Sequence, residues 1–207
     1  MVDLFAKFVK NLHFMLKEIF FELEEQLKIK KAPVIEKFKP GLPEKEIRDQ
    51  LKTFNIENEL LVELYSWKNG IDSDYAVGEY EIFSFGTMYS LNDAIEEYKA
   101  RIEEDIWNKS LFPIFVGTDH ILFDTSKGEN GKLWFDAPML LLPDKPVVIY
   151  DSIVRMLGTI IECYRFNAYN FSETGELQID YDLEEQISKQ LNPNSHYWSQ
   201  ETGPFIK

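Results

Sequence analysis

The sequence predicts an α+β fold, in which several helices accompany a set of short strands. Long segments carry apolar residues at spacings of three and four, and a central stretch alternates apolar runs with glycine-containing breaks. Hydrophobic residues make up 44% of the 207 positions, with 16 Phe, 10 Tyr and 4 Trp. A chain of this length and composition can bury one substantial core, and it fits one domain with extensions better than two domains.

The first predicted helix spans 4–27 and is amphipathic, with a wide apolar stripe rich in Phe. Its apolar positions are 5, 8, 12, 15, 16, 19, 20, 23 and 27. Such a face must lie against the domain that follows, a second copy of the chain or a partner, and we expect packing on its own domain. Basic residues at 28–31 suit the negative end of the helix dipole, and Pro33 prevents simple continuation.

Two shorter helices are predicted next. Pro43 suits the first turn of a helix that runs to about Phe54 with Ile47 and Leu51 facing inward. Asn55 is the predicted N-cap of the following helix, whose apolar residues lead into the stretch "LYSWKNGI": Leu60, Leu61, Leu64, Tyr65 and Trp67.

The end of that helix has a glycine signal. We expect Gly70, or Asn69, to adopt the left-handed conformation that closes a helix, with Ile71 folding back on the last turn. A strand is then predicted at 81–85.

Ser90 is predicted to start another helix, with Asp93 completing a capping box. We predict that the buried face of this helix consists of Ala94, Ile95, Tyr98, Ile102 and Ile106.

The stretch "LFPIFVGTDHILFDTSKGENGKLWFDAP" reads as strand, turn, strand, hairpin, strand, with Asn130-Gly131 as the hairpin signal. "MLLLPDKPVVIY" predicts a strand pair or an edge strand. Asp151 or Ser152 is expected to cap a helix that buries Ile153, Met156, Leu157, Ile160, Ile161 and Tyr164. A short acidic helix follows, with Asp182 and Glu185 as its predicted capping pair.

The net charge of −14 is unevenly distributed. Residues 57–106 carry 13 acidic and 3 basic side chains, and residues 172–207 carry 7 and 2, whereas residues 1–56 are slightly basic. Negative surface of this density repels phosphate backbones, so we expect no direct nucleic-acid binding, and it attracts a basic protein partner. Acidic residues that only keep the protein in solution are the alternative interpretation.

Compartment signals agree with a cytoplasmic protein. Cys163 is the only cysteine, so no disulfide forms within the chain and a reducing compartment is expected. Charged residues interrupt the apolar N-terminus, unlike a signal peptide, and no segment approaches the roughly 20 apolar residues of a membrane span.

Catalytic chemistry has three candidate locations. Cys163 lies within an apolar helical pattern, which favours a buried inert thiol over a nucleophile. His120 beside Asp119 could form an acid/base pair, but neighbours on a strand point to opposite faces, and a surface histidine is the alternative. Asp124 and Asp136 flank the hairpin, and together they could bind a cation or act on a glycoside. The sequence offers no third ligand that would support such a site. "KGENGK" lacks the context of a phosphate-binding loop. We therefore predict no cofactor, no metal and no catalytic residue.

The order of these motifs resembles the SUKH superfamily, over about 36–171. The resemblance rests on Pro-Gly-Leu before a helix, a helix ending in "LYSWKNGI", and Gly117 and Asp119 before a hairpin. Family members often have Leu-Pro where this sequence has "IENE". The N-terminal helical extension at 1–35 and the acidic C-terminal helix and tail at 172–207 have no family counterpart. The resemblance implies one domain with a curved, mainly antiparallel sheet and helices packed against it.

The resemblance also implies a function in protein binding. The superfamily includes bacterial immunity proteins that neutralise toxins by direct contact and a fungal regulator of cell-wall glucan synthesis. We expect a toxin-immunity protein with a basic partner such as a nuclease domain, and a regulator of cell-wall synthesis is the alternative. A homo-oligomer could form through the N-terminal helix.

Partner binding is predicted at the loop after "LYSWKNGI", where aromatic side chains adjoin acidic ones. The predicted contact residues are Trp67, Asn69, Asp72, Asp74, Tyr75, Glu79 and Asp119. Structural roles are predicted for Gly41, Asn69, Gly70, Gly117, Asn130 and Gly131. The competing interpretation makes Trp67 a core residue and Asn69-Gly70 only a helix cap.

Overall fold

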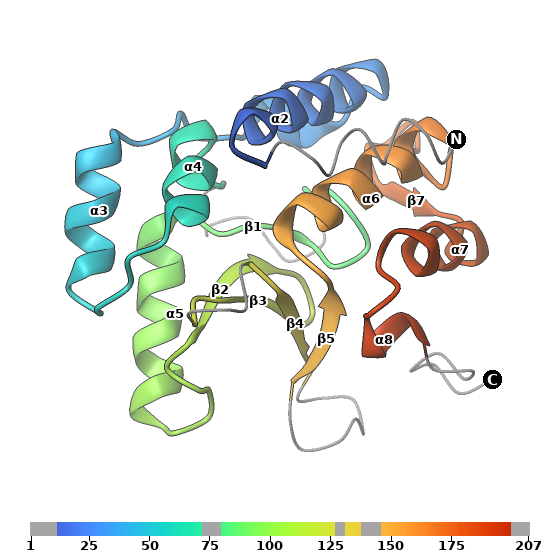
Figure 1. The fold of residues 1–207 in the computed structure, drawn as a ribbon. Helices are drawn as coiled ribbons and strands as arrows, with labels where there is room; N and C mark the ends of the chain where they lie inside the picture. The colour runs from blue at the N-terminus through green and yellow to red at the C-terminus, as the bar shows by residue number, and fades with distance from the viewer. Residues whose placement is uncertain (1–11, 72–79, 127–130, 138–145, 200–207) are drawn as a thin grey trace.

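The computed structural model describes residues 12–71, 80–126, 131–137 and 146–199, with side chains from Leu16 onward. Its central element is a five-stranded sheet of β1 (Thr87–Met88), β2 (Leu111–Val116), β3 (His120–Asp124), β4 (Leu133–Asp136) and β5 (Val147–Tyr150). Each strand pairs antiparallel with the next one along the chain. Register shifts between β2 and β3 and between β4 and β5 bend the sheet, and its curvature is visible in Figure 1. The predicted α+β class with a curved antiparallel sheet is confirmed.

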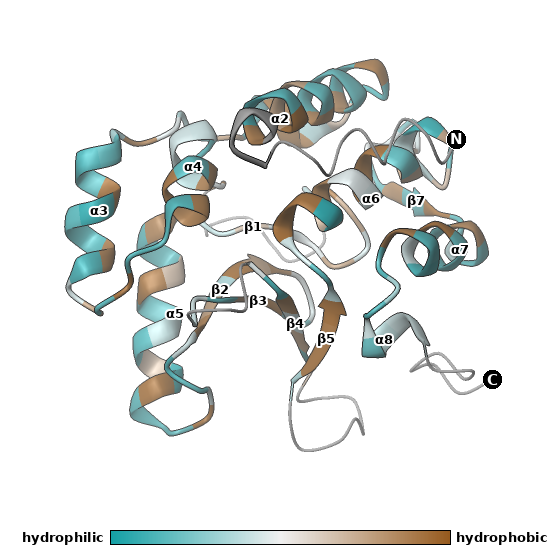
Figure 2. Cartoon of the chain, in the orientation of Figure 1, coloured by the Kyte–Doolittle hydropathy of each residue, from teal (hydrophilic) through white to brown (hydrophobic). Residues whose placement is uncertain are grey.

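The core lies between this sheet and α6 (Ile153–Arg165), which in turn packs against the N-terminal helix α2 (Leu12–Ile29) (Figure 1). α6 is buried on nearly all sides, as expected for a helix between two layers. Ser152 is its N-cap. α2 buries the predicted residues Leu16, Ile19, Phe20, Leu23 and Leu27, which confirms that it packs on its own domain. Figure 2 shows the apolar colouring of the strands and the mostly hydrophilic α3 at the edge of the molecule.

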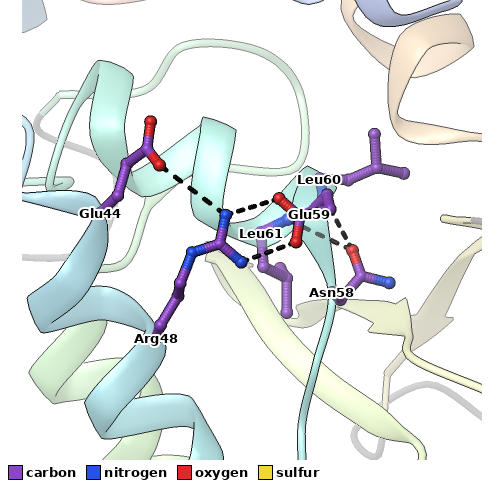
Figure 3. A network of polar contacts seen from close by, with 6 residues as sticks. All are labelled: Glu44, Arg48, Asn58, Glu59, Leu60 and Leu61. Carbon is purple, nitrogen blue, oxygen red and sulfur yellow. Dashed lines mark hydrogen bonds and ion pairs between the residues drawn. The ribbon is translucent and has the colours of Figure 1, made fainter.

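α3 (Glu44–Lys52) and α4 (Glu59–Trp67) follow a short 3-10 turn at Pro33–Glu36. Arg48 on α3 donates to both carboxylate oxygens of Glu59 at 2.6 Å and lies 3.7 Å from Glu44 (Figure 3). This exposed fork holds the start of α4 against α3. Ile47 and Leu51 are buried as predicted.

The predicted cap of α4 is wrong by three residues. Asn58, not Asn55, is the N-cap, and its side chain accepts from the backbone N–H groups of Leu60 and Leu61 (Figure 3). Asn55 has a φ of +59° and belongs to the turn that ends α3, because Asn tolerates the left-handed region there.

The end of α4 also differs from the prediction. Lys68 leaves the helix in an extended conformation. Gly70 has the expected positive φ of +63°. Ile71 then donates its N–H to the carbonyl of Met88 on β1, and its side chain is buried in the core. The glycine therefore directs the chain into the sheet and does not close the helix.

The strand predicted at 81–85 is a turn. Phe83 bridges to Gly86, and β1 begins only at Thr87. Gly86 has a φ of +109°, and a Cβ there would lie 2.0 Å from the carbonyl oxygen of Val116. The chain reverses at this glycine, and Phe83 is fully buried beside it.

α5 (Leu91–Glu103) begins as predicted, because the Ser90 hydroxyl accepts from the N–H of Asp93 and donates to its carboxylate. The predicted burial of Ile106 is wrong. The helix ends at Glu103, Asp105 adopts a φ of +55°, and Ile106 is 47% exposed.

The hairpin between β3 and β4 is confirmed by their pairing, and Gly131 has a φ of +76° at its return. Asn130 lies outside the described residues. The last part of the apolar stretch "MLLLPDKPVVIY" forms β5, at the edge of the sheet.

The C-terminal part consists of a hairpin of β6 (Tyr169–Phe171) and β7 (Leu177–Ile179), followed by α7 (Tyr181–Leu191) and α8 (His196–Ser199). Asp180 caps α7 by accepting from Leu183 N–H. The predicted capping pair of Asp182 and Glu185 is wrong, because the helix starts two residues earlier and Glu185 pairs with Lys189. No described helix combines the length and apolarity required to cross a membrane.

Candidate functional site

The acidic part of the predicted binding loop is outside the described residues. This applies to four of the predicted contact residues: Asp72, Asp74, Tyr75 and Glu79. The structure describes the two ends of this loop, at Ile71 and Tyr80, and the other predicted residues.

Trp67 is directed toward the N-terminal helix. Its ring stacks on Phe20 of α2 with centroids 4.5 Å apart and planes 4° from parallel. Its indole N–H donates to Glu24 at 2.7 Å, and the same carboxylate lies 3.2 Å from the ammonium of Lys68. The aromatic residue predicted as a partner anchor is thus a half-buried contact between α2 and α4.

Asn69 and Gly70 join the end of α4 to the start of α5. The Asn69 side-chain oxygen accepts from the backbone N–H of Leu91, the first residue of α5, at 2.8 Å. A Cβ on Gly70 would lie 2.3 Å from the carbonyl carbon of Tyr89. A Cβ on Gly117 would likewise lie close to the Phe85 carbonyl oxygen, at 2.9 Å. Asn69, Gly70 and Gly117 therefore lie where the backbones of neighbouring segments approach each other closely.

Asp119 lies beside a cluster of ionisable and aromatic side chains at one end of the sheet. His120 opens β3 directly opposite Asp136 on β4. The Asp136 carboxylate accepts from the indole N–H of Trp107 at 2.6 Å. The Trp107 ring lies edge-on to His120, 5.2 Å between centroids.

α5 supplies the other side of this cluster. Glu97 accepts from Arg101 at 2.6 Å and lies 3.4 Å from His120 Nε2. The Arg101 guanidinium lies 5.6 Å from the centre of the Trp107 ring, a cation–π distance. We define the His120 cluster as Glu97, Arg101, Trp107, His120 and Asp136.

Burial has the largest effect on the electrostatics of the cluster, and the neighbouring carboxylates come second. Burial lowers the pKa of His120 below its usual value, and Glu97 opposes this shift. Burial and the neighbouring Asp136 raise the pKa of Asp119. His120 Nδ1 and one oxygen of Asp119 are buried without a hydrogen-bond partner among the described residues. His120 is thus largely buried, with 12% of its side chain exposed, and not a surface histidine.

Next to the cluster, the chain has an exposed acidic end. Glu103, Glu104 and Asp105 are all exposed, and Ile106 follows them. We call these four residues the acidic end of α5. Carboxylates are disfavoured at the C-terminal end of a helix, where the dipole is negative. This segment therefore combines three consecutive exposed carboxylates with an exposed apolar side chain, a composition suited to a basic surface.

The alternative carboxylate site is not formed. Asp124 accepts from Trp134 at 3.2 Å and from Ser126 N–H at 2.9 Å. It lies four positions along β3 from His120, the partner of Asp136, so about 13 Å separates the two aspartates at the usual strand rise. They do not form a pair.

Two further candidates can be placed. Cys163 is fully buried in α6, and burial raises the pKa of its thiol, as the buried-thiol interpretation requires. Among the residues that the structure describes, no three His, Cys, Asp or Glu side chains are grouped to hold a metal ion.

Sequence reasoning missed Glu97, Arg101 and Trp107 as members of the site. The i,i+4 spacing of Glu97 and Arg101 was a usable signal for their ion pair. No local pattern joins Trp107 to Asp136, because 29 residues separate them.

No protein-family model and no curated protein sequence matches this chain.

Proposed function

We propose that this protein is a binding module that neutralises a toxin by direct contact, and that the partner is a basic protein domain such as a nuclease. The observation that carries the proposal is the acidic end of α5, where three exposed carboxylates adjoin an exposed isoleucine. The SUKH resemblance supplies the immunity role, and the charge supplies the character of the partner.

Electrostatics favour this interpretation over a purely solubilising role for the acids. Charges that serve only solubility are best dispersed among opposite charges. Here the carboxylates are consecutive and lie at the helix end where the dipole disfavours them. A basic partner would relieve this repulsion and would be steered to the site during approach. A nuclease surface that binds phosphate carries the positive charge that such a partner requires.

The first experiment is affinity capture from the native host with the full chain as bait, followed by purification of the captured protein. We expect a basic protein whose activity or toxicity is suppressed at a 1:1 ratio with this chain. Capture of kinases or glycan synthases without such inhibition would contradict the immunity role and favour the regulatory alternative.

A charge-reversal variant tests the surface itself. Glu103, Glu104 and Asp105 changed together to Lys should slow association at low salt by about tenfold or more, because steering is lost. Stopped-flow measurement at several salt concentrations checks this, and the rate of the unmodified protein should fall steeply with salt.

A matched control carries the same charge change elsewhere. Glu173, Glu176 and Asp182 are exposed on the C-terminal hairpin and α7. Their triple change to Lys also raises the net charge from −14 to −8, since each replacement adds two charges. Equal slowing by both variants would mean that net charge, and not the acidic end of α5, controls association.

A further inference from the structure

A buried carboxyl group connects the C-terminal helix to the middle of the chain. Glu184 on α7 is only 2% exposed. Its Oε1 accepts hydrogen bonds from the Ser84 hydroxyl and the Tyr169 hydroxyl, which lie 3.3 Å from each other. Three separate segments therefore meet at this carboxyl: the turn at 80–86, β6 and α7.

No positive charge faces this carboxyl in the part of the chain that the structure describes. The ion pairs of the described residues do not include Glu184. The titratable groups that interact with it electrostatically come from β5, α6, β6 and α8: Tyr150, Cys163, Tyr169 and Tyr197. Burial raises the pKa of each, so all four are neutral near pH 7. On α7 itself, the neighbouring Glu185 pairs with Lys189 and is partly exposed.

An ionised carboxyl in this position is poorly compensated. Two hydroxyl donors stabilise the charge, but burial without a cation disfavours it. The balance raises the pKa of Glu184, with burial as the largest cause and the two hydroxyl bonds opposing it. The neutral form fits the site and the charged form is disfavoured there.

We propose that Glu184 is a pH-sensitive latch, which holds α7 against the turn at 80–86 when neutral and loosens it when ionised. α8 follows α7 and contacts the same turn, since Tyr197 and Trp198 lie 5.6 and 6.0 Å from the Phe85 ring. Release of α7 would therefore free one side of a turn that begins where the predicted partner-binding loop ends. This inference stands without the proposed function.

The direction and steepness of the effect follow from linkage. A carboxyl whose pKa is higher in the folded state stabilises the closed state fully below its unfolded pKa. That stability is lost as the pH rises from the unfolded pKa of about 4.5 through the folded pKa. Within this window, loss of one proton raises the opening constant of α7 by up to tenfold per pH unit. Above the folded pKa the constant levels off.

Amide hydrogen exchange of 181–191 in the full chain, from pH 4 to 8, tests the proposal. Exchange is measured where it is limited by the opening equilibrium and corrected for the intrinsic rate. We expect the opening constant of the unmodified protein to rise with pH and level off, and that of Glu184→Gln to stay flat and lower at pH 7. Glu185→Gln, the matched control, should follow the unmodified protein. Parallel profiles of the unmodified protein and Glu184→Gln would overturn the proposal.

A second variant keeps the test decisive if Glu184→Gln does not fold. Tyr169→Phe removes a hydroxyl that lowers the pKa of Glu184. Loss of this hydroxyl should raise the pKa of Glu184 further, so the pH at which the opening constant reaches its plateau should also rise. An unchanged position of that plateau would show that Glu184 does not control the opening.

Discussion

Replacement of Gly41 by Ala is expected to lower the free energy of unfolding by about 3 kcal/mol or more, the upper range for single substitutions. A Cβ at this position would lie 1.8 Å from the carbonyl oxygen of Ser66 and 2.4 Å from its carbonyl carbon. The close crossing is fixed by hydrogen bonds on both sides, from Leu42 N–H to the Tyr65 carbonyl and from Asn69 N–H to the Lys39 carbonyl. Because both partners are backbone, neither can rotate away.

Urea denaturation of the purified variant measures this loss, with Gly175→Ala as the control. Gly175, unlike Gly41, has a positive φ, +85°, and its Cβ would meet only the flexible ring of Pro33, at 2.8 Å. We expect the control to lose about 1–2 kcal/mol from backbone strain. If Gly41→Ala lowers the free energy of unfolding by no more than Gly175→Ala does, the close contact between the segment at 39–42 and the end of α4 does not constrain the fold as inferred.

The features that the sequence predicted well are local ones. Ser90 with Asp93, and Ser152 before α6, are caps that involve four consecutive residues, so composition and spacing are enough to find them. The buried faces of α2 and α6 follow from helical periodicity for the same reason.

The errors arise where a distant segment decides the conformation. The residues at 81–85 have strand-like composition, but the approach of Gly86 to Val116, thirty positions away, makes them a turn. Ile106 fits the helical pattern of α5, yet the chain turns at Asp105 and buries Trp107 instead. The local sequence pattern cannot distinguish a strand from a turn at 81–85, or a buried from an exposed Ile106, because contacts with distant segments decide both.

The candidate site shows the same division. Asp119, His120 and Asp136 were visible in the sequence as polar residues at strand ends. Their neighbours were not, because Trp107 reaches Asp136 only after the link from α5 to β2 folds over the sheet. The acidic end of α5 was apparent as charge density but not as a surface, since its exposure depends on where the helix stops.

Trp67→Ala is the variant that separates a structural role of the "LYSWKNGI" motif from a direct role in partner binding. We expect it to lower the free energy of unfolding by about 2–3 kcal/mol, somewhat below the usual loss for a fully buried aromatic residue because Trp67 is half-buried. The stack on Phe20 and the hydrogen bond to Glu24 are both lost. Since these contacts join α2 to α4, exchange protection should fall first in α2.

Trp67→Phe provides the closest comparison, because it keeps an aromatic ring against Phe20 and removes the hydrogen bond to Glu24 together with a small part of the ring contact. We expect a loss of about 1 kcal/mol in the same urea measurement, with partner affinity unchanged in both variants at temperatures where they are folded. An alanine variant of unaltered stability whose partner affinity drops would contradict the structural role. It would show that Trp67 contacts the partner directly, as the partner-binding prediction requires.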